Sequence, residues 1–323
     1  MGVIGSIVWD VIHGRHANAA PVEEWGGISY GLAGLDAALD DDWEIVPIIK
    51  VGHDLAYRAT QFMRTFIRMA PDAALISVPY PNNRVELRYI DEERRTELMT
   101  GGVPGWTWLG LKPVLEMARL DALYVNFLSG WEIDVETAQL IRRNFAVPIY
   151  CDLHMLAWAI QPDGFRTLRP IPNVREWCGS FDFMQVNEDE MTMLAPDPMA
   201  LAATAMHAGV RSLSVTMGKR GAVYFAAPDF ERLADADVPR TDHDALSASL
   251  GPLRTALVPA EHVAPGDPTG CGDVWGATQF SRLLAGDNLH AAILAANHAA
   301  ARNVGHRGAT GLADHLRGKI SLT

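Results

Sequence analysis

The chain has 323 residues, of which 49% are hydrophobic and 20% are charged, and its formal net charge is -12. This usage excludes a disordered chain, and the length allows one large α/β domain or two smaller ones. The negative charge disfavours nucleic acids and anionic membranes as partners, but not a nucleotide held by local groups. The three cysteines form no CxxC pair, and the amino terminus has no signal-like segment, so we expect a cytoplasmic protein.

Short apolar segments alternate with helical patterns along the chain, which predicts a mostly parallel sheet with crossover helices. Strands are expected at residues 3–9, 45–51, 74–78, 122–128, 147–151, 181–186, 212–217 and 255–258. Helices are expected at residues 55–69, 135–144, 199–207 and 289–303, where apolar residues recur at spacings of three and four.

One part of the chain departs from this alternation. Residues 84–90 and 94–99 alternate in polarity on either side of a polar turn, which predicts a hairpin outside the main sheet. We therefore expect one domain, residues 1–323, with a small β lid formed by about 11–26 and 80–108. The acidic stretch 228–251 has no clear period and is expected to be a loop.

The most informative segment has the sequence DPTGCGDVWG and runs from Asp267 to Gly276. Gly270 and Gly272 allow main-chain N–H groups to approach an anion, and the start of the following helix adds partial positive charge. Asp273 stands at that helix start, where it is placed to accept a proton from an attacking hydroxyl. An aspartate in the first turn also caps helices. From this residue alone, a role as proton acceptor and a role as helix cap have equal weight.

This segment resembles the D-T-x-G-A-G-D-x-F-x-x-G signature of the ribokinase and phosphofructokinase-B (PfkB) sugar kinase family. Pro268, Cys271 and Trp275 replace the usual Thr, Ala and Phe. The resemblance, which extends over about residues 3–312, implies a three-layer α/β/α sandwich with a mostly parallel sheet and a small β-sheet lid. It also implies an ATP-dependent kinase that uses Asp273 as general base.

Other roles follow from the resemblance alone. The anion hole for the transferred phosphoryl group is assigned to Gly270, Cys271 and Gly272. Substrate binding is assigned to Asp10, Gly26, Gly27 and Asn126, with Glu132 as an alternative to the last. Binding of ATP is assigned to Asn187, Glu190, Thr216, Gly218, Lys219, Gly221 and Asn297. Glu190 would organise water around Mg2+, and a monovalent cation such as K+ would be bound by Asp267 and Thr269.

Each of these weaker matches has a structural alternative. Asp10 and the Gly26-Gly27 pair also suit a turn or a plain loop, and Asn187 with Glu190 suits a capping box at a helix start. Residues 216–221 also suit an ordinary hairpin. The sequence does not decide whether Lys219 or the adjacent Arg220 contacts phosphate.

The substrate end departs most from the family pattern. Ile28 and Gly31 stand where ribokinases carry a Lys and an Asn, so ribose specificity is not expected. The acceptor is a sugar, a sugar-like molecule or a nucleoside. Asp152 and His154 are placed to line the pocket, although such a buried pair is more often structural.

Two other function classes compete with the kinase. Gly27 to Gly31 match the G-x-S-x-G pattern of serine hydrolases, with Ser29 as nucleophile, but the preceding segment is too polar and short for the buried strand that this motif needs. A ligand-sensing pseudokinase would keep the fold without turnover, and the intact Asp273, Gly272 and Glu190 count against it. The lid strands also offer edges through which a homodimer could form.

Overall fold

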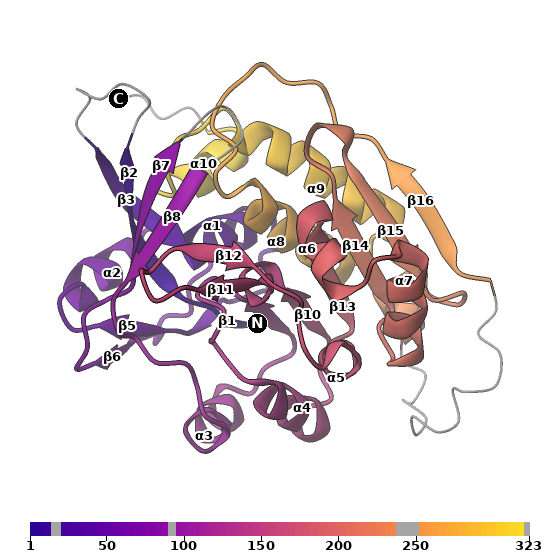
Figure 1. Ribbon diagram of the computed structural model, residues 1–323, viewed down its shortest axis with the longest axis horizontal. Coiled ribbons are helices and arrows are strands. Elements are labelled where there is room, and N and C mark those ends of the chain that lie inside the picture. Colours follow the sequence, from indigo (N-terminus) through magenta and orange to yellow (C-terminus); the bar gives the residue numbers. More distant parts are fainter. Residues whose placement is uncertain (14–20, 90–94, 237–251, 320–323) are drawn as a thin grey trace.

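The computed structural model describes residues 1–13, 21–89, 95–236 and 252–319 (Figure 1). Most of the expected loop at 228–251 and the turn of the expected hairpin lie outside these ranges. No helix in the described part of the chain combines the length and apolar character needed to cross a bilayer.

An eight-stranded sheet forms the centre of the molecule, with strand order β16-β15-β14-β13-β10-β9-β1-β4. Its strands are β1 (Gly2–Ile4), β4 (Val46–Ile48), β9 (Leu123–Asn126), β10 (Ile149–Asp152), β13 (Phe183–Asn187), β14 (Ser212–Thr216), β15 (Ala222–Ala226) and β16 (Arg254–Val258). The strands from β14 to β4 pair in parallel, whereas β15 and β16 are antiparallel. The predicted mostly parallel α/β fold is therefore confirmed.

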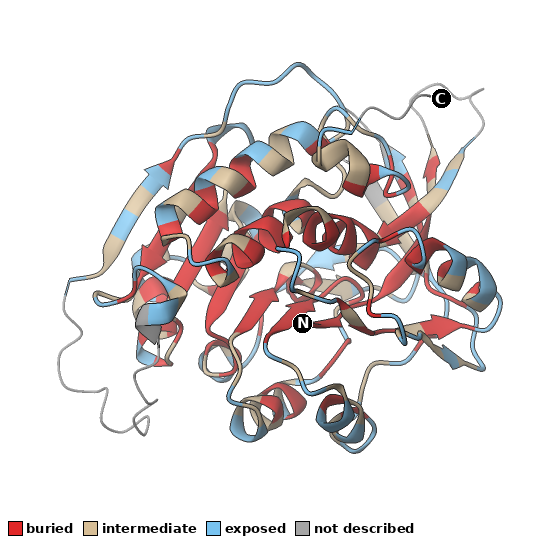
Figure 2. Ribbon diagram, turned by 180° about the vertical axis from the view of Figure 1, so that it is seen from behind, coloured by how far each residue is buried: buried red, intermediate tan, exposed pale blue. Residues whose placement is uncertain are grey.

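Helices cover both faces of this sheet (Figures 1 and 2). One face packs against α1 (Ile28–Ala38), α2 (Ala56–Met63), α8 (Cys271–Leu284), α9 (Leu289–Asn303) and α10 (Leu312–Leu316). The other packs against α3 (Trp108–Ala118), α4 (Val135–Asn144), α5 (Val174–Cys178), α6 (Glu188–Leu194) and α7 (Pro198–His207). Alternate residues of β9 enter the two hydrophobic cores, as the two-residue period of a strand requires. Burial on both faces explains why these strands are continuous apolar runs.

A separate four-stranded sheet, with order β3-β2-β7-β8, lies beside the central one (Figure 1). Its strands are β2 (Ile7–His13), β3 (Val22–Gly27), β7 (Arg84–Tyr89) and β8 (Arg95–Thr100). Alternation along β2 and β7 gathers a small hydrophobic cluster on one face, formed by Val8, Ile12, Val85, Leu87 and Met99. The hairpin expected from the alternating pattern is confirmed by the β7–β8 pairing.

Two further pairs of strands are short. They are β5 (Lys50–Gly52) with β6 (Ile76–Val78), and β11 (Trp158–Ile160) with β12 (Arg166–Leu168). The strand expected at 45–51 is thus divided between two sheets, and the one expected at 74–78 pairs with β5 instead of joining the central sheet. Three single turns of 3-10 helix complete the described elements: η1 (His154–Ala157), η2 (Gly218–Arg220) and η3 (Leu233–Ala236).

A buried ion pair ties the amino ends of β10 and β13 to α4. The guanidinium of Arg142 donates to both carboxylate oxygens of Asp182, each over 2.9 Å, and the side chain of Asp182 is only 3% exposed. The main-chain N–H of Ile149 donates to the same carboxylate over 2.8 Å. Burial and the neighbouring Arg211 lower the pKa of Arg142 to about 10.

We expect Asp182→Asn to lower the free energy of unfolding by about 3–5 kcal/mol, because it leaves the buried Arg142 without its countercharge. Glu116→Gln, at an exposed pair with Lys112 on α3, is the matched control and should change the free energy by less than about 0.5 kcal/mol. Urea unfolding followed by circular dichroism measures both. Equal effects of the two substitutions would contradict the structural role given to Asp182.

Candidate active site

The candidate site lies at the carboxyl ends of the parallel strands, where ligands bind in open α/β sheets. The final residues of β9, β10, β13 and β14 are Asn126, Asp152, Asn187 and Thr216. The amino terminus of α8 meets this edge of the sheet, because the side-chain amide of Asn126 donates to the Asp273 carboxylate over 2.7 Å.

The glycine-rich loop begins α8 as the sequence predicts. Gly270 is the N-cap residue with a φ of 77°, and the ring of Tyr30 packs so closely that a Cβ at Gly270 would lie 2.1 Å from its Cδ1. The N–H groups of the first helical turn have no acceptor within their own helix. The N–H of Cys271, however, donates to the carbonyl of Pro268 over 3.1 Å, so its expected place in the anion hole is not available in this geometry. Gly270 and Gly272 remain as the main-chain donors.

Asp273 lies in the first turn of α8 and lines a cavity. Burial raises the pKa of its carboxyl above the ordinary value, while the positive charge of His154 and the hydrogen bond from Asn126 oppose that rise. The carboxylate is therefore fixed in direction by one amide and is more basic than an exposed aspartate.

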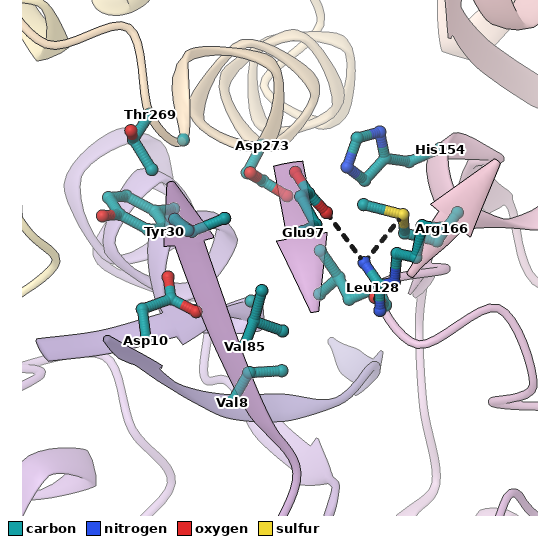
Figure 3. A pocket seen from close by; sticks show the side chains of 14 residues that line it. Val8, Asp10, Tyr30, Val85, Glu97, Leu128, His154, Arg166, Thr269 and Asp273 are labelled. Atoms are coloured by element: carbon teal, nitrogen blue, oxygen red, sulfur yellow. Dashed lines mark hydrogen bonds and ion pairs between the residues drawn. The ribbon is translucent and has the colours of Figure 1, made fainter. Parts of the chain in front are cut away.

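The cavity has an empty volume of about 470 Å3, part of it open to solvent, and its walls come from the four-stranded sheet and from helices, loops and β12 of the body (Figure 3). The four-stranded sheet supplies Asp10 from β2 and Glu97 from β8. The body of the fold supplies Tyr30 from α1, His154 from η1, Arg166 from β12, and Asp273. The cavity thus places carboxylates from three different elements, β2, β8 and α8, around one volume.

The two adjacent glycines support Asp10. A Cβ at Gly26 would lie 1.9 Å from Oδ2 of Asp10, so only glycine leaves room for that carboxylate. Gly27 lines the cavity and begins α1 with a φ of 60°, which disfavours any other residue. These three predicted residues are therefore brought together at the cavity.

Asn126 and Glu132 lie elsewhere than expected. Asn126 is fully buried behind Asp273 and is not part of the cavity wall. Glu132 accepts hydrogen bonds from the main-chain N–H groups of Leu128, Ser129 and Gly130, and thereby holds the loop after β9. Asn126 is thus a positioning residue for Asp273, and Glu132 is a structural one.

Asn187 and Glu190 form the capping box that the sequence allowed as an alternative. Both carboxylate oxygens of Glu190 are engaged, by the N–H and the side-chain amide of Asn187 and by His154 at 2.7 Å. Burial opposes a charge on His154, but the neighbouring carboxylates of Glu190, Asp152 and Asp273 outweigh it and raise the pKa of His154 to about 9.

These contacts do not fit a metal site at Glu190. Its side chain is 2% exposed and already holds an imidazole. Within the described ranges, no group of three or more His, Cys, Asp or Glu side chains is arranged to hold a metal ion. Direct coordination of a metal by Glu190 is therefore not expected, and its link to magnesium through water stays a prediction.

The two residues expected to bind a monovalent cation, Asp267 and Thr269, are hydrogen-bonded within the fold. The carbonyl of Thr269 accepts from the side-chain amide of Asn303 over 2.9 Å, and the Asp267 carboxylate accepts from the N–H of Thr269 over 3.0 Å. The buried amide of Asn303 thus holds the loop where an ion was expected.

The segment 216–221 is the turn of an antiparallel hairpin between β14 and β15. Arg220 forms an ion pair with Glu188, while Lys219 is exposed. Thr216 is half-buried at the end of β14, and Gly218 and Gly221 both have positive φ values, at 54° and 94°.

The side chain of Asn297 is hydrogen-bonded within the fold. Its amide donates to the carbonyls of Val258 and Pro259 over 3.0 and 3.2 Å, and its carbonyl accepts from Trp275 over 2.8 Å. The side chain is 4% exposed, so the expected contact with adenine has no support here.

Ser29 does not have the surroundings of a hydrolase nucleophile. It begins α1 after β3, but its residue is 0% exposed and its hydroxyl has no hydrogen-bond partner in the described part of the chain. A nucleophilic serine needs a base within reach and an open approach for substrate. The serine hydrolase hypothesis therefore has no support.

Three polar cavity residues were not predicted from the sequence: Tyr30, Glu97 and Arg166. Which residues of α1 and β8 face the cavity depends on the rotation of the helix and the register of the strand, so Tyr30 and Glu97 could not be assigned from the sequence. Arg166 belongs to a hairpin of three-residue strands, too short for a periodic signal. Glu97 and Arg166 are far apart in the chain and belong to no common motif, so their contact could not be predicted.

The contact between Asn126 and Asp273 generates a direct test. Asn126→Ala should raise the pKa of the Asp273 carboxyl further, because it removes a hydrogen bond that favours the charged form. Carbon-13 NMR of aspartate-labelled protein measures this, with Asp273→Asn to assign the signal. An unchanged titration in Asn126→Ala would contradict the link.

Comparison with known proteins agrees with this fold. Residues 161–315 match the model of the pfkB family carbohydrate kinases. No curated protein matches the sequence.

Among solved structures, the ribokinase of Thermotoga maritima is 16% identical, with a TM-score of 0.66 and 98% of each chain covered. The nucleoside kinase of Burkholderia thailandensis in complex with inosine is 16% identical, with a TM-score of 0.69, and the match covers 97% of this chain and 93% of that one. A pyrophosphate-dependent kinase of the ribokinase family, complexed with a pyrophosphate analog and myo-inositol, is 13% identical, with a TM-score of 0.69 and coverages of 95% and 96%. At these identities the likeness shows the fold. The chain therefore has the ribokinase fold over nearly its whole length, and its residues 161–315 are similar to the pfkB family of carbohydrate kinases.

Proposed function

We propose that the protein transfers the γ-phosphoryl group of ATP to a hydroxyl of a small sugar or sugar-like molecule, with Asp273 as the general base. The observation that carries this proposal is the position of the Asp273 carboxylate, beside the first turn of α8 and in one cavity with Asp10. A nucleoside is the alternative acceptor, because a nucleoside kinase is among the proteins with the same fold.

The chemistry follows from this arrangement. The acceptor oxygen attacks the γ-phosphorus, its proton passes to the Asp273 carboxylate, and ADP leaves. The N–H groups of Gly270 and Gly272 and the positive end of α8 stabilise the charge on the phosphoryl oxygens. Asn126 keeps the carboxylate oriented through its hydrogen bond. Such a reaction needs positioning and charge stabilisation more than covalent catalysis.

The nucleotide would approach from the hairpin turn between β14 and β15. We assign phosphate contact to Lys219 instead of Arg220, because Arg220 is paired with Glu188. Thr216, Gly218 and Gly221 stay the proposed main contacts of this turn, and magnesium enters with ATP as part of the substrate. A cytoplasmic location is part of the proposal.

The four-stranded sheet is the proposed lid, formed by about residues 11–26 and 80–108. Because β2 begins at Ile7, the sheet starts earlier than this expected range and includes Asp10. It supplies Asp10 and Glu97 to the cavity wall and would exclude water when substrate is bound. Its β8 edge already bridges to Phe165 next to β12, which leaves less of that edge for a homodimer.

Asp273→Asn should lower kcat by about 10²- to 10⁴-fold while binding of ATP is retained, because the substitution removes the base and keeps the shape. Asp314→Asn, in the first turn of α10, is the matched control for a purely helix-capping role and should leave kcat unchanged. A coupled assay of ADP release measures turnover. Near-normal turnover by Asp273→Asn would remove this residue from the mechanism.

Gly26→Ala should raise the KM for the acceptor by at least about 10-fold, because the added Cβ displaces the Asp10 carboxylate. The KM for ATP should stay within about 3-fold of its original value, since ATP binds on the other side of the cavity. Initial rates with each substrate varied in turn separate the two constants. An equal rise in both would contradict the assignment of Asp10 to the acceptor.

A further inference from the structure

We infer that Gln185 is a positioning residue for the proposed phosphoryl transfer, because its side-chain amide holds the peptide group between Gly272 and Asp273. Gln185 belongs to β13 and lies beneath the first turn of α8. The inference rests on the proposed function. It goes beyond that function because it assigns the position of the main-chain donors to buried polar side chains that are not part of the described cavity wall.

The side chain of Gln185 reaches from the central sheet to the glycine-rich loop. Its Nε2 donates to the main-chain carbonyl of Gly272 over 3.0 Å, although the two residues are 87 positions apart in the chain. A carbonyl oxygen has two lone pairs, and an α-helix uses one of them for the N–H four residues later. The hydrogen bond from Gln185 is therefore additional to those that the helix needs.

A buried network holds the Gln185 amide in one orientation. The hydroxyl of Tyr150 donates to its Oε1 over 2.9 Å, and the ring of Tyr150 stacks on that of Tyr124 with the centroids 5.4 Å apart. The same hydroxyl contacts Gln279 of α8 at 2.8 Å, and Gln279 donates to Ser214 over 3.0 Å. A rotation of the Gln185 amide would leave buried polar atoms without partners, so the network opposes it.

Gly276 provides a second, independent indication that this amide has a specific place. A Cβ at Gly276 would lie 2.1 Å from Oε1 of Gln185 and 3.2 Å from the hydroxyls of Tyr124 and Tyr150. Glycine in the interior of a helix is destabilising, because it loses more backbone freedom on folding than other residues. Its presence one turn after Gly272 is explained by the space that the Gln185 amide occupies.

The contact acts on the peptide group that leads into the proposed base. Because a peptide group is planar, a fixed Gly272 carbonyl also fixes the N–H of Asp273 and the orientation of Gly272 itself. Asn126 holds the carboxylate of Asp273, and the hydroxyl of Tyr124 lies 3.5 Å from its main-chain carbonyl. Side chains of β9 and β13 thus hold the first turn of α8 together. A shift of about 1 Å in such groups costs up to about 100-fold in rate.

The first experiment tests the contact in the free protein. The chain has three Gly-Asp peptide bonds, at 266–267, 272–273 and 286–287, so carbon-13 labelling of glycine carbonyls with nitrogen-15 labelling of aspartate gives one NMR signal for each. Gln185→Met keeps the length of the side chain and removes the N–H donor. We expect it to move the 272–273 signal, assigned with Asp273→Asn, and to leave the other two in place. An unmoved 272–273 signal would overturn the inference.

The second experiment measures whether the contact serves catalysis. Gln185→Met should lower kcat by about 10- to 100-fold, because donors aimed at the phosphoryl group act mainly in the transition state. The KM values for ATP and for the acceptor should stay within about 3-fold. Gln279→Met is the matched control, since Gln279 is as deeply buried but its hydrogen bonds go to Tyr150 and Ser214 instead of the first turn of α8. It should change kcat by less than about 3-fold.

Thermal unfolding of each variant separates loss of positioning from loss of the fold. If Gln185→Met does not fold, Gly276→Ala decides, because its Cβ displaces the Gln185 amide without removing it and should move the same signal and lower kcat. Equal kcat losses in Gln185→Met and Gln279→Met, or no loss in Gln185→Met, would overturn the positioning role. A moved 272–273 signal with no turnover of ATP by the unsubstituted protein would instead overturn the proposed kinase function and leave the hold of Gln185 on the loop standing.

Discussion

The hydrogen bond from Asn126 to Asp273 joins two segments that are 147 residues apart in the chain. It connects the carboxyl end of β9, in the middle of the central sheet, to the first turn of α8. Through this contact the main-chain donors of the glycine-rich loop and a carboxylate face the same cavity. The contact also opposes the effect of burial on the pKa of Asp273, which would otherwise rise further. Positioning and basicity of the proposed base thus depend on one side-chain amide.

The cavity depends equally on the sheet that stands outside the central layers. Asp10 and Glu97 reach the cavity from β2 and β8, and the Arg166–Glu97 pair connects this sheet to the β11–β12 hairpin of the body. A main-chain hydrogen bond from Met99 to Gly164, 3.1 Å long, reinforces the same junction. The polar groups that would recognise the acceptor are therefore held by elements that also fix the sheet in place.

The sequence predicted the parts of the site that have a local signal. Gly270 and Asp273 could be assigned because a glycine-rich loop followed by a helix is recognisable from consecutive residues and suits an anion. Asp10 and Gly26 were assigned from the resemblance. Helix α1 was missed because nearly all of its residues are buried, so it shows no polar face. Cys271, Glu190 and Asn297 were given functional roles from the resemblance alone, whereas their atoms are engaged by Pro268, Asn187 and Trp275. Hydrogen-bond partners of this kind come from tertiary contacts and cannot be deduced from motif spacing.

The most direct test of the central claim is a crystal structure with ADP, magnesium and aluminium fluoride, which mimics the phosphoryl group in transfer. The account predicts that the fluoride ligands accept hydrogen bonds from the N–H groups at the start of α8, Gly272 among them. It also predicts that the Asp273 carboxylate faces the aluminium from the acceptor side, with the volume between them lined by Asp10 and Glu97. A mimic bound away from α8, or packed side chains between it and Asp273, would contradict the account.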